Sequence, residues 1–295
     1  MYHISPEAFP AGRVLVTHTI PTLLKGEHLS DEPEPQRLAV KITFRGLTLN
    51  FYSRIVAVDV FGTNGVIHGV DTLLIPPPNV IKIIDLLPSE FSTLELGLGK
   101  TGLLEEFNTT HHPGGTFFAP NNFAFLKLGP RINAFLFSEY GRKYLKALLE
   151  YHVVPGTTLY SDAIYSNHMN KTDEGHHVPK GYFHYTLPTL LHDQVLEVDV
   201  GRYGGFISIK VNGFGRVSVQ DGIAEDGVIQ VVSDVLIPPK NKLHPPTVAG
   251  KKGFFGKVGR WFQGEKDEMT LEEFVQRMAP FVGETAEEAL YRAEM

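Results

Sequence analysis

The sequence of 295 residues contains no cysteine. It can therefore form no disulfide, no thiolate metal site and no cysteine nucleophile, and burial of apolar side chains must stabilise its fold. It also lacks any run of about 18 apolar residues, the length that a membrane-spanning helix requires. Positive charge is not in excess, because 27 basic residues face 33 acidic ones for a net charge of −6. The composition therefore predicts no nucleic-acid partner.

The N-terminal residues lack the pattern of a secretory signal peptide. Residues 1–20 contain no basic start followed by an apolar run of roughly 7–15 residues. The last residues, 284–295, are too rich in charge for a glycolipid-anchor signal. We therefore expect the chain to begin inside folded sequence and to carry no membrane anchor.

The sequence repeats itself once, over a distance typical of a domain. NGVIHGVDTLLIPP at 64–77 recurs as DGVIQVVSDVLIPP at 226–239, 162 residues later. The pair Tyr-His at 2–3 recurs at 151–152, 149 residues later. An insertion in the polar stretch 166–180 of the second copy accounts for the difference, because surface loops accept extra length at little entropic cost. The sequence therefore predicts two copies of one domain.

The first copy is incomplete, because residues 80–150 of the second copy have no counterpart in it. The sequence predicts four parts: the C-terminal half of a first domain (1–78), a complete domain (79–239), a basic and aromatic linker (240–268) and a helical tail (269–295). A half domain would leave one apolar face of its sheet uncovered, which is unstable alone. We expect it either to pack on its neighbour or to belong to a chain that begins earlier.

Within the complete domain, the apolar spacing predicts helices first and strands afterwards. A short buried helix is expected at 80–87, and a helix with one apolar face at 138–152. Period-two alternation predicts strands at 195–200, 206–211, 216–219 and 228–232 of the second copy and at 40–44, 47–51 and 55–60 of the first. This order predicts an α+β fold with an antiparallel sheet.

Three motifs of the second copy resemble those of fasciclin (FAS1) domains. TFFAPNNFAF at 116–125 resembles the first conserved box of that family, the segment 226–239 resembles the second, and Tyr-His at 151–152 resembles the motif between them. The resemblance implies the FAS1 fold, an antiparallel β-wedge or sandwich with a layer of short helices. The first copy resembles the family only from its Tyr-His pair onward.

The first box also has a physical interpretation. Asn121 follows a proline and can cap a short helix. The side chains of Phe123, Phe125 and Leu126 would then seal the helical layer onto the sheet.

The resemblance implies a non-catalytic protein that adheres to extracellular or cell-wall components. Fungal secreted proteins with two such domains look most similar in style. The implied partner is a protein or polysaccharide of the matrix or cell wall, and the implied location is extracellular or in the secretory pathway, with the signal peptide lost together with the N-terminus. The alternative is a membrane-associated factor of the vacuole or secretory pathway that acts through its C-terminal tail.

The resemblance also implies candidate binding residues. In animal members, the Tyr-His motif and an Asp-Ile motif just before the second box are implicated in integrin binding. The corresponding residues are Tyr151, His152 and Asp221 in the second copy and Tyr2, His3 and Asp59 in the first. Neither aspartate precedes isoleucine, so integrin itself is not predicted. The alternative for the Tyr-His pair is structural, with the imidazole bonding buried backbone groups while the tyrosine packs in the core.

One further position differs between the copies. The second copy has Gln230 where the first has His68, the residue usual in the family. This departure argues against a shared role for the side chain at that position.

No motif of the sequence predicts catalysis, a metal or a cofactor. GLGKTG at 97–102 lacks the leading glycine of a phosphate loop and follows no expected strand, so we interpret it as helix and loop. Several histidines gather near the inserted stretch at no spacing known for zinc, which favours a solvated loop. They are His168, His176, His177, His184 and His192. We therefore predict that the protein is not an enzyme.

Two asparagines begin N-glycosylation acceptor triplets. They are Asn108 and Asn170, and both fall in expected loops. Passage through the secretory pathway would make them candidate glycosylation sites.

The chain after the second copy changes composition. Basic and aromatic residues alternate there, a pattern that can lie on an anionic membrane surface or contact a partner. The candidate contact residues are Lys251, Lys252, Phe254, Phe255, Arg260 and Trp261. The interpretation that we favour is a linker whose rings pack back onto the domain. Capping boxes at Thr270 and Thr285 predict a helical hairpin in the tail.

Overall fold

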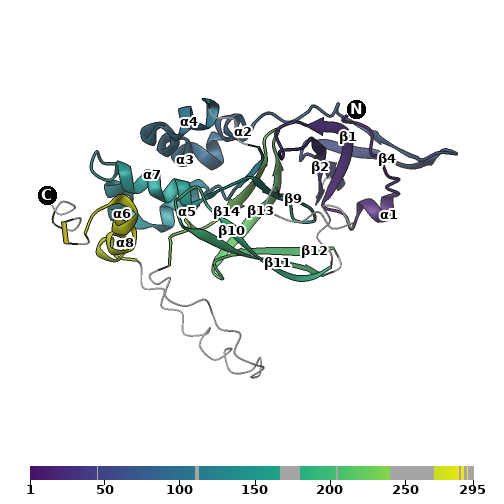
Figure 1. Ribbon diagram of the computed structural model, residues 1–295. Helices are drawn as coiled ribbons and strands as arrows, with labels where there is room; N and C mark the ends of the chain where they lie inside the picture. The colour runs from purple at the N-terminus through teal and green to yellow at the C-terminus, as the bar shows by residue number, and fades with distance from the viewer. Residues whose placement is uncertain are drawn as a thin grey trace, which may run out of the picture.

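The structure, a computed structural model, describes residues 1–44, 46–109, 113–166, 180–203, 205–239, 269–285, 287–288 and 291. We call residues 1–78 the first copy and residues 79–239 the second copy. In Figure 1 the first copy (purple and blue) lies beside the sheet of the second copy, and the helices of the second copy lie at the opposite end.

The first copy is an antiparallel meander in which each strand pairs with the next one along the chain. Its elements are α1 (Ala11–Val14), β1 (Thr19–Gly26), β2 (Glu34–Thr43), β3 (Gly46–Leu49), β4 (Ser53–Phe61) and β5 (Val66–Val70). The strands predicted at 40–44, 47–51 and 55–60 fall within or overlap β2, β3 and β4, so their existence is confirmed.

The second copy begins with a layer of short helices. They are α2 (Val80–Leu86), α3 (Pro88–Thr101), α4 (Leu103–Thr109), α5 (Asn122–Lys127), α6 (Gly129–Leu136) and α7 (Arg142–Tyr151). The motif at 97–102 lies at the end of α3 and in its left-handed cap at Gly102, as the helix-and-loop interpretation predicts. The helix expected at 138–152 begins only at Arg142, because the Oγ of Ser138 accepts a hydrogen bond from the backbone N–H of Gly141 (3.0 Å) in a preceding turn.

The strands of the second copy form a seven-stranded sheet in the order β10-β11-β12-β13-β14-β6-β7, and a separate β8-β9 pair. They are β6 (Gly115–Phe117), β7 (Val153–Pro155), β8 (Thr157–Leu159), β9 (Ile164–Ser166), β10 (Gly181–Pro188), β11 (Val195–Tyr203), β12 (Phe206–Val211), β13 (Gly215–Ile223) and β14 (Val228–Val232). Within this sheet β14 and β6 pair in parallel, with Val228 opposite Thr116, while the other pairs are antiparallel. The predicted α+β class is confirmed.

The cap of α5 forms as expected, but its packing differs. The side chain of Asn121 accepts a hydrogen bond from the backbone N–H of Ala124 (2.9 Å). Phe125 is buried, whereas Phe123 and Leu126 are 55% and 71% exposed. The prediction that all three seal the core is wrong, because residues 123 and 126 share the outer face of this short helix.

A buried polar cluster joins the first copy to the second. The guanidinium of Arg37 donates to the hydroxyl of Tyr165 (3.0 Å) and to the carbonyl oxygen of Thr19 (3.2 Å). The carboxylate of Asp162 accepts from the backbone N–H groups of His18 (3.0 Å) and Thr19 (2.8 Å). Because Arg37 and Asp162 are both buried, these bonds fix the two copies in one arrangement.

Apolar packing supports the same interface. Leu29 and Ala39 of the first copy form one buried cluster with Tyr160, Tyr165 and Val228 of the second. The first copy therefore packs on its neighbour, one of the two expectations for a half domain.

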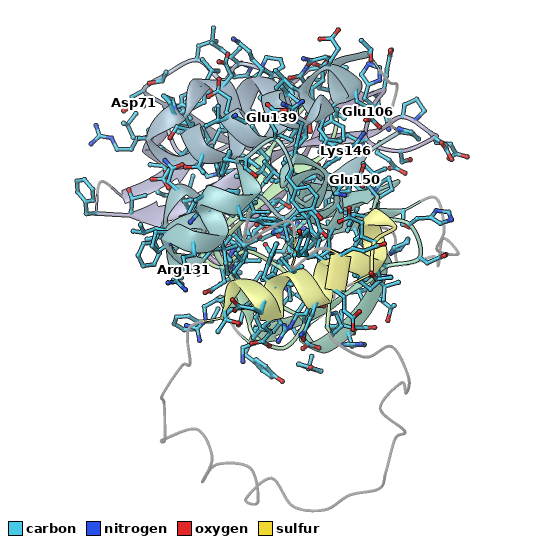
Figure 2. All side chains as sticks on the ribbon, turned by 90° about the vertical axis from the view of Figure 1, so that its left-hand side faces the viewer. Asp71, Glu106, Arg131, Glu139, Lys146 and Glu150 are labelled. Carbon is cyan, nitrogen blue, oxygen red and sulfur yellow. The ribbon has the colours of Figure 1, made fainter. Side chains whose placement is uncertain are left out.

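The described part of the tail packs on the helical layer. The Oγ1 of Thr270 accepts from the backbone N–H of Glu273 (3.2 Å), so the first capping box opens α8 (Leu271–Met278). Phe274, Val275 and Met278 are fully buried in the main core, and α8 contacts α6 and α7. Figure 2 shows α8 (yellow) lying across this end of the molecule, near Arg131 of α6. The short 3-10 helix η3 (Ala279–Val282) follows directly. The second capping box also forms, because the Oγ1 of Thr285 accepts from the backbone N–H of Glu288 (3.3 Å), the carboxylate of Glu288 accepts from the backbone N–H of Thr285 (3.3 Å), and residues 287–288 are helical.

Glu284 anchors the end of this tail segment. Its carboxylate accepts hydrogen bonds from Lys143, from Tyr140 and from Tyr144 (2.7 Å for the last). Burial raises the pKa of Glu284, but these three donors outweigh burial and lower the pKa to about 2.

Candidate interaction site

The tyrosine of the Tyr-His pair is a buried clamp in the second copy. The hydroxyl of Tyr151 donates to the carbonyl oxygen of Val195 (3.2 Å) and accepts from the Nδ2 of Asn212 (2.8 Å). The side-chain oxygen of Asn212 in turn accepts from the backbone N–H of Glu197 (3.1 Å). Tyr151 is fully buried, which raises the pKa of its hydroxyl to about 12 and keeps it a neutral hydrogen-bonding group.

The first copy contains the same clamp. The hydroxyl of Tyr2 donates to the carbonyl oxygen of Arg37 (3.1 Å) and accepts from the Nδ2 of Asn50 (2.8 Å). The side-chain oxygen of Asn50 accepts from the backbone N–H of Ala39 (2.9 Å). Both asparagines have a left-handed backbone, with φ of 46° and 52°, which asparagine tolerates better than most residues. Sequence reasoning missed them, although they lie 162 residues apart like the repeated boxes.

The two histidines accept hydrogen bonds from equivalent leucines, but one imidazole is buried and the other is exposed. The Nε2 of His152 accepts from the backbone N–H of Leu236 (2.9 Å), and its Nδ1 donates to the carbonyl oxygen of Leu148 (2.7 Å). Complete burial lowers the pKa of His152 to about 4, so the imidazole is neutral. The Nε2 of His3 accepts from the backbone N–H of Leu74 (3.1 Å), but this imidazole is exposed.

The two aspartates anchor bulges in equivalent strands. The carboxylate of Asp221 in β13 accepts from the backbone N–H (2.7 Å) and the hydroxyl (2.5 Å) of Ser161. The carboxylate of Asp59 in β4 accepts from the backbone N–H of Ala11 (2.8 Å). Both aspartates have a left-handed φ, of 58° and 57°, where the register of the strand pair shifts. Burial raises the pKa of Asp221, and the neighbouring Asp162 raises it further.

The side chains at positions 68 and 230 play one role with different chemistry. The Nδ1 of His68 accepts from the backbone N–H of Asp59 (3.4 Å), and its Nε2 donates to the carbonyl oxygen of Phe9 (2.7 Å). Gln230 accepts from the backbone N–H of the bulge aspartate of its own copy (3.2 Å) and donates to the carbonyl oxygen of Leu159 (2.8 Å). The amide and the imidazole each supply the acceptor and the N–H donor that these two bonds require, and Gln230 also donates to the carboxylate of Asp221 (3.3 Å). The substitution therefore preserves the interaction, contrary to our interpretation of the sequence.

In the second copy, these candidate residues are closed to a ligand. Tyr151 and His152 have no exposed surface and Asp221 has 4%, and each bonds a different part of the backbone. This geometry favours the structural alternative for the Tyr-His pair. In the first copy Tyr2 is also buried, whereas His3 is exposed and Asp59 is partly exposed.

The first copy opens a cavity at the face that helices cover in the second copy. It has a volume of about 560 Å³, and His3 and His68 belong to its lining. Its apolar lining includes Leu38, Leu49, Val70 and Leu74. The second-copy counterparts of these four, by the repeat and the matching bonds, lie in the main core among the helices; they are Leu196, Val211, Val232 and Leu236.

The hairpin of β4 and β5 exposes further apolar side chains. Figure 1 shows β4 projecting away from the rest of the molecule. The exposed residues are Val56, Val58, Val60, Phe61 and Ile67, with exposed fractions from 51% to 70%. An apolar surface of this kind is typical of an interaction site. Together with the cavity, it forms what we call the open face of the first copy.

Of the glycosylation and linker candidates, the structure describes only Asn108. Asn108 is exposed but lies in α4, so the loop expected there is wrong because the helix continues to Thr109. Asn170 lies outside the described residues, as do the linker candidates Lys251, Lys252, Phe254, Phe255, Arg260 and Trp261.

Of the clustered histidines, His168, His176 and His177 lie outside the described residues. His184 lies on the sheet surface, within 2.8 Å of Asp199 and of Glu197, and the hydrogen bond to Asp199 raises its pKa. Across the part of the chain that the structure describes, no group of three or more potential ligands could hold a metal ion. Within the same part, no helix is long and apolar enough to cross a membrane.

Comparison with known proteins finds one family in both copies of the repeat. The family described as Fasciclin domain matches residues 1–76 and 89–238. Aurofusarin biosynthesis cluster protein S of Gibberella zeae is 30% identical over 299 residues, which cover 96% of this chain and 70% of that protein. Human periostin is 28% identical over 67% of this chain, and mouse stabilin-2 is 29% identical over 47%. These matches cover 21% of periostin and 6% of stabilin-2, so the chain spans a small part of these animal relatives.

One solved structure is also similar to the chain. It is a FAS1 domain pair from the insect cell adhesion molecule Fasciclin I, with 19% sequence identity and a TM-score of 0.43. The match covers 76% of this chain and 79% of that one.

Proposed function

Because the chain belongs to the fasciclin domain family, we propose that it is a non-catalytic adhesion protein of the extracellular space or secretory pathway. Its partner is a protein or polysaccharide of a matrix or cell wall.

The observation that carries the proposal is the open face of the first copy. It combines a cavity of about 560 Å³ with exposed apolar strands. Exposed apolar surface costs free energy in water, about 25 cal/mol per Å², and a partner that covers it recovers that free energy. Of the candidate residues, Tyr151, His152 and Asp221 are buried in the second copy, whereas the exposed His3 lines the cavity of this face.

A binding assay with matched variants tests the proposal. The full chain is immobilised on beads and offered insoluble chitin, insoluble β-1,3-glucan and type I collagen. Phe61→Lys places a charge on the open face at a side chain that is 70% exposed. Phe206→Lys makes the same change at a side chain of β12 that is 85% exposed, on the second copy.

We expect binding to at least one of these materials, weakened tenfold or more by Phe61→Lys and unchanged by Phe206→Lys. Equal effects of the two substitutions, or no binding to any of the three, would contradict the proposal. Both side chains are largely exposed, so neither change is expected to unfold the protein.

A second candidate function comes from the fungal relative, whose name refers to a biosynthesis cluster. In that case the cavity of the first copy holds a small apolar molecule, since its volume lies within the usual range for small-molecule sites. A thermal-shift screen with small apolar compounds, which match the apolar lining of the cavity, separates the two candidates. Stabilisation that is lost in Leu49→Arg, without binding to the matrix panel, would favour the second candidate.

A further inference from the structure

A groove lies between three helices of the second copy. Its volume is about 290 Å³, and residues of α2, α3 and α4 contribute to its walls. These three helices contact one another, and Figure 1 shows them together along the top of the molecule. The lining includes Ile81, Lys82, Asp85, Glu95, Leu104 and Asn108.

Asn108 brings an acceptor for a modification into this lining. Asn108 and Leu104 lie four residues apart in α4 and therefore share one face of the helix. Glu106 belongs to another side of α4, where its carboxylate lies 3.3 Å from the Nζ of Lys146 in α7 (Figure 2). Asn108 is exposed and begins the triplet Asn-Thr-Thr, the acceptor pattern for an N-linked glycan. A glycan attached to Asn108 would therefore start in the groove.

The groove combines apolar and polar groups, as a sugar ring requires. Ile81 and Leu104 are half-buried and offer apolar surface to the C–H groups of a ring. The carboxylates of Asp85 and Glu95 can accept hydrogen bonds from hydroxyl and acetamide N–H groups, and Lys82, which is ion-paired with Asp85, adds a donor. The volume lies just below the range of about 300–1,000 Å³ that is usual for small-molecule sites, so it suits one ring rather than a chain of rings.

We propose that Asn108 carries an N-linked glycan whose first N-acetylglucosamine packs in the groove between α2, α3 and α4. In the transfer, the side-chain nitrogen of Asn108 forms a bond to C1 of that sugar and loses a proton, while the bond from C1 to the diphosphate of a lipid-linked oligosaccharide breaks. The inference rests on the proposed function, because this transfer takes place in the secretory pathway. The packed ring covers Ile81 and Leu104 and thereby stabilises this part of the helical layer.

Stability measurements on the secreted full chain test the inference. All proteins carry Thr172→Ala, which removes the only other acceptor triplet of the sequence, at Asn170. The chain is secreted from yeast behind a signal peptide, and mass spectrometry of its glycopeptides measures the occupancy of Asn108. Endoglycosidase H then trims the glycan to its first N-acetylglucosamine, whereas Thr110→Ala yields the same chain without a glycan.

We expect Asn108 to be occupied in most molecules. The trimmed protein should keep the melting temperature of the fully glycosylated protein, and the Thr110→Ala protein should melt about 2–4 °C lower. Glu95→Ala, which removes a polar wall of the groove, should at least halve that difference. Glu90→Ala is the matched control, at an exposed position of α3 outside the groove lining, and should leave the difference unchanged.

Three results would overturn the inference: an unoccupied Asn108, equal melting temperatures with and without the glycan, or a melting temperature that falls on trimming to the value of Thr110→Ala. Equal effects of Glu95→Ala and Glu90→Ala on the difference would also overturn it, because the sugar would then not lie in the groove. The matrix panel separates this inference from the proposed function. The expected occupancy and melting temperatures without panel binding refute only the proposed adhesion, whereas panel binding with an unoccupied Asn108 refutes only this inference.

Discussion

Replacement of the buried histidine provides a quantitative test of the Tyr-His pair as a structural element. His152→Ala removes the acceptor for the backbone N–H of Leu236 and the donor to the carbonyl oxygen of Leu148. A buried backbone group left without a partner costs about 1–3 kcal/mol. Loss of the ring atoms adds a cavity term of about 1–2 kcal/mol. We therefore expect His152→Ala to reduce the free energy of unfolding by about 3 kcal/mol or more.

The equivalent change in the first copy is a built-in control. His3 is exposed and makes one hydrogen bond, to Leu74 at 3.1 Å, so His3→Ala should cost only about 0.5–1.5 kcal/mol. Urea denaturation followed by circular dichroism at 222 nm measures both values. Equal costs for the two variants, or a stable His152→Ala protein that has lost matrix binding, would refute the structural interpretation.

The remaining predictions concern Gln230, the tail and the linker. Gln230→His should change stability by less than about 1 kcal/mol, because His68 makes the same pair of bonds in the first copy, whereas Gln230→Leu should cost about 2 kcal/mol or more in the same denaturation assay. The pKa of Glu284 is depressed to about 2, so its contribution is present above the ordinary value of 4.5 and is lost as the pH falls toward 2. Glu284→Gln should flatten that part of the stability profile, and an unchanged acid profile would contradict the anchor. If the linker contacts membranes, flotation with vesicles containing phosphatidylserine should require Lys251 and Lys252, and flotation that survives Lys251→Glu with Lys252→Glu would contradict this role.

The sequence alone predicted the elements that depend on local pattern. The closing strand expected at 228–232 and the strand at 206–211 match β14 and β12 residue for residue. The cap at Asn121 and the helix opened by Thr270 also form as expected. In each case, alternation or a capping side chain lies within a few residues of the structure that it specifies.

The interactions between distant segments could not be predicted in this way. His68 and Gln230 are equivalent because each side chain bridges a strand bulge and a backbone carbonyl oxygen. That carbonyl oxygen lies far away in sequence, 59 residues from His68 and 71 residues from Gln230, so no local pattern reveals the equivalence. The burial of Arg37 depends on Tyr165 of the other copy, which no local pattern reveals. The binding role of Tyr151, His152 and Asp221 remains a proposal of the family resemblance, and their burial directs attention to the open face instead.

Hydrogen–deuterium exchange across β5 tests the central claim most directly. The backbone amides of Val66–Val70 are followed in the full chain, alone and with a saturating amount of the panel material that binds it. We expect slower exchange in β5 when the material is bound, with no change in β14, whose edge β6 already covers. Protection confined to the second copy, or no change in β5 at saturation, would contradict the claim that the open face of the first copy is the interaction surface.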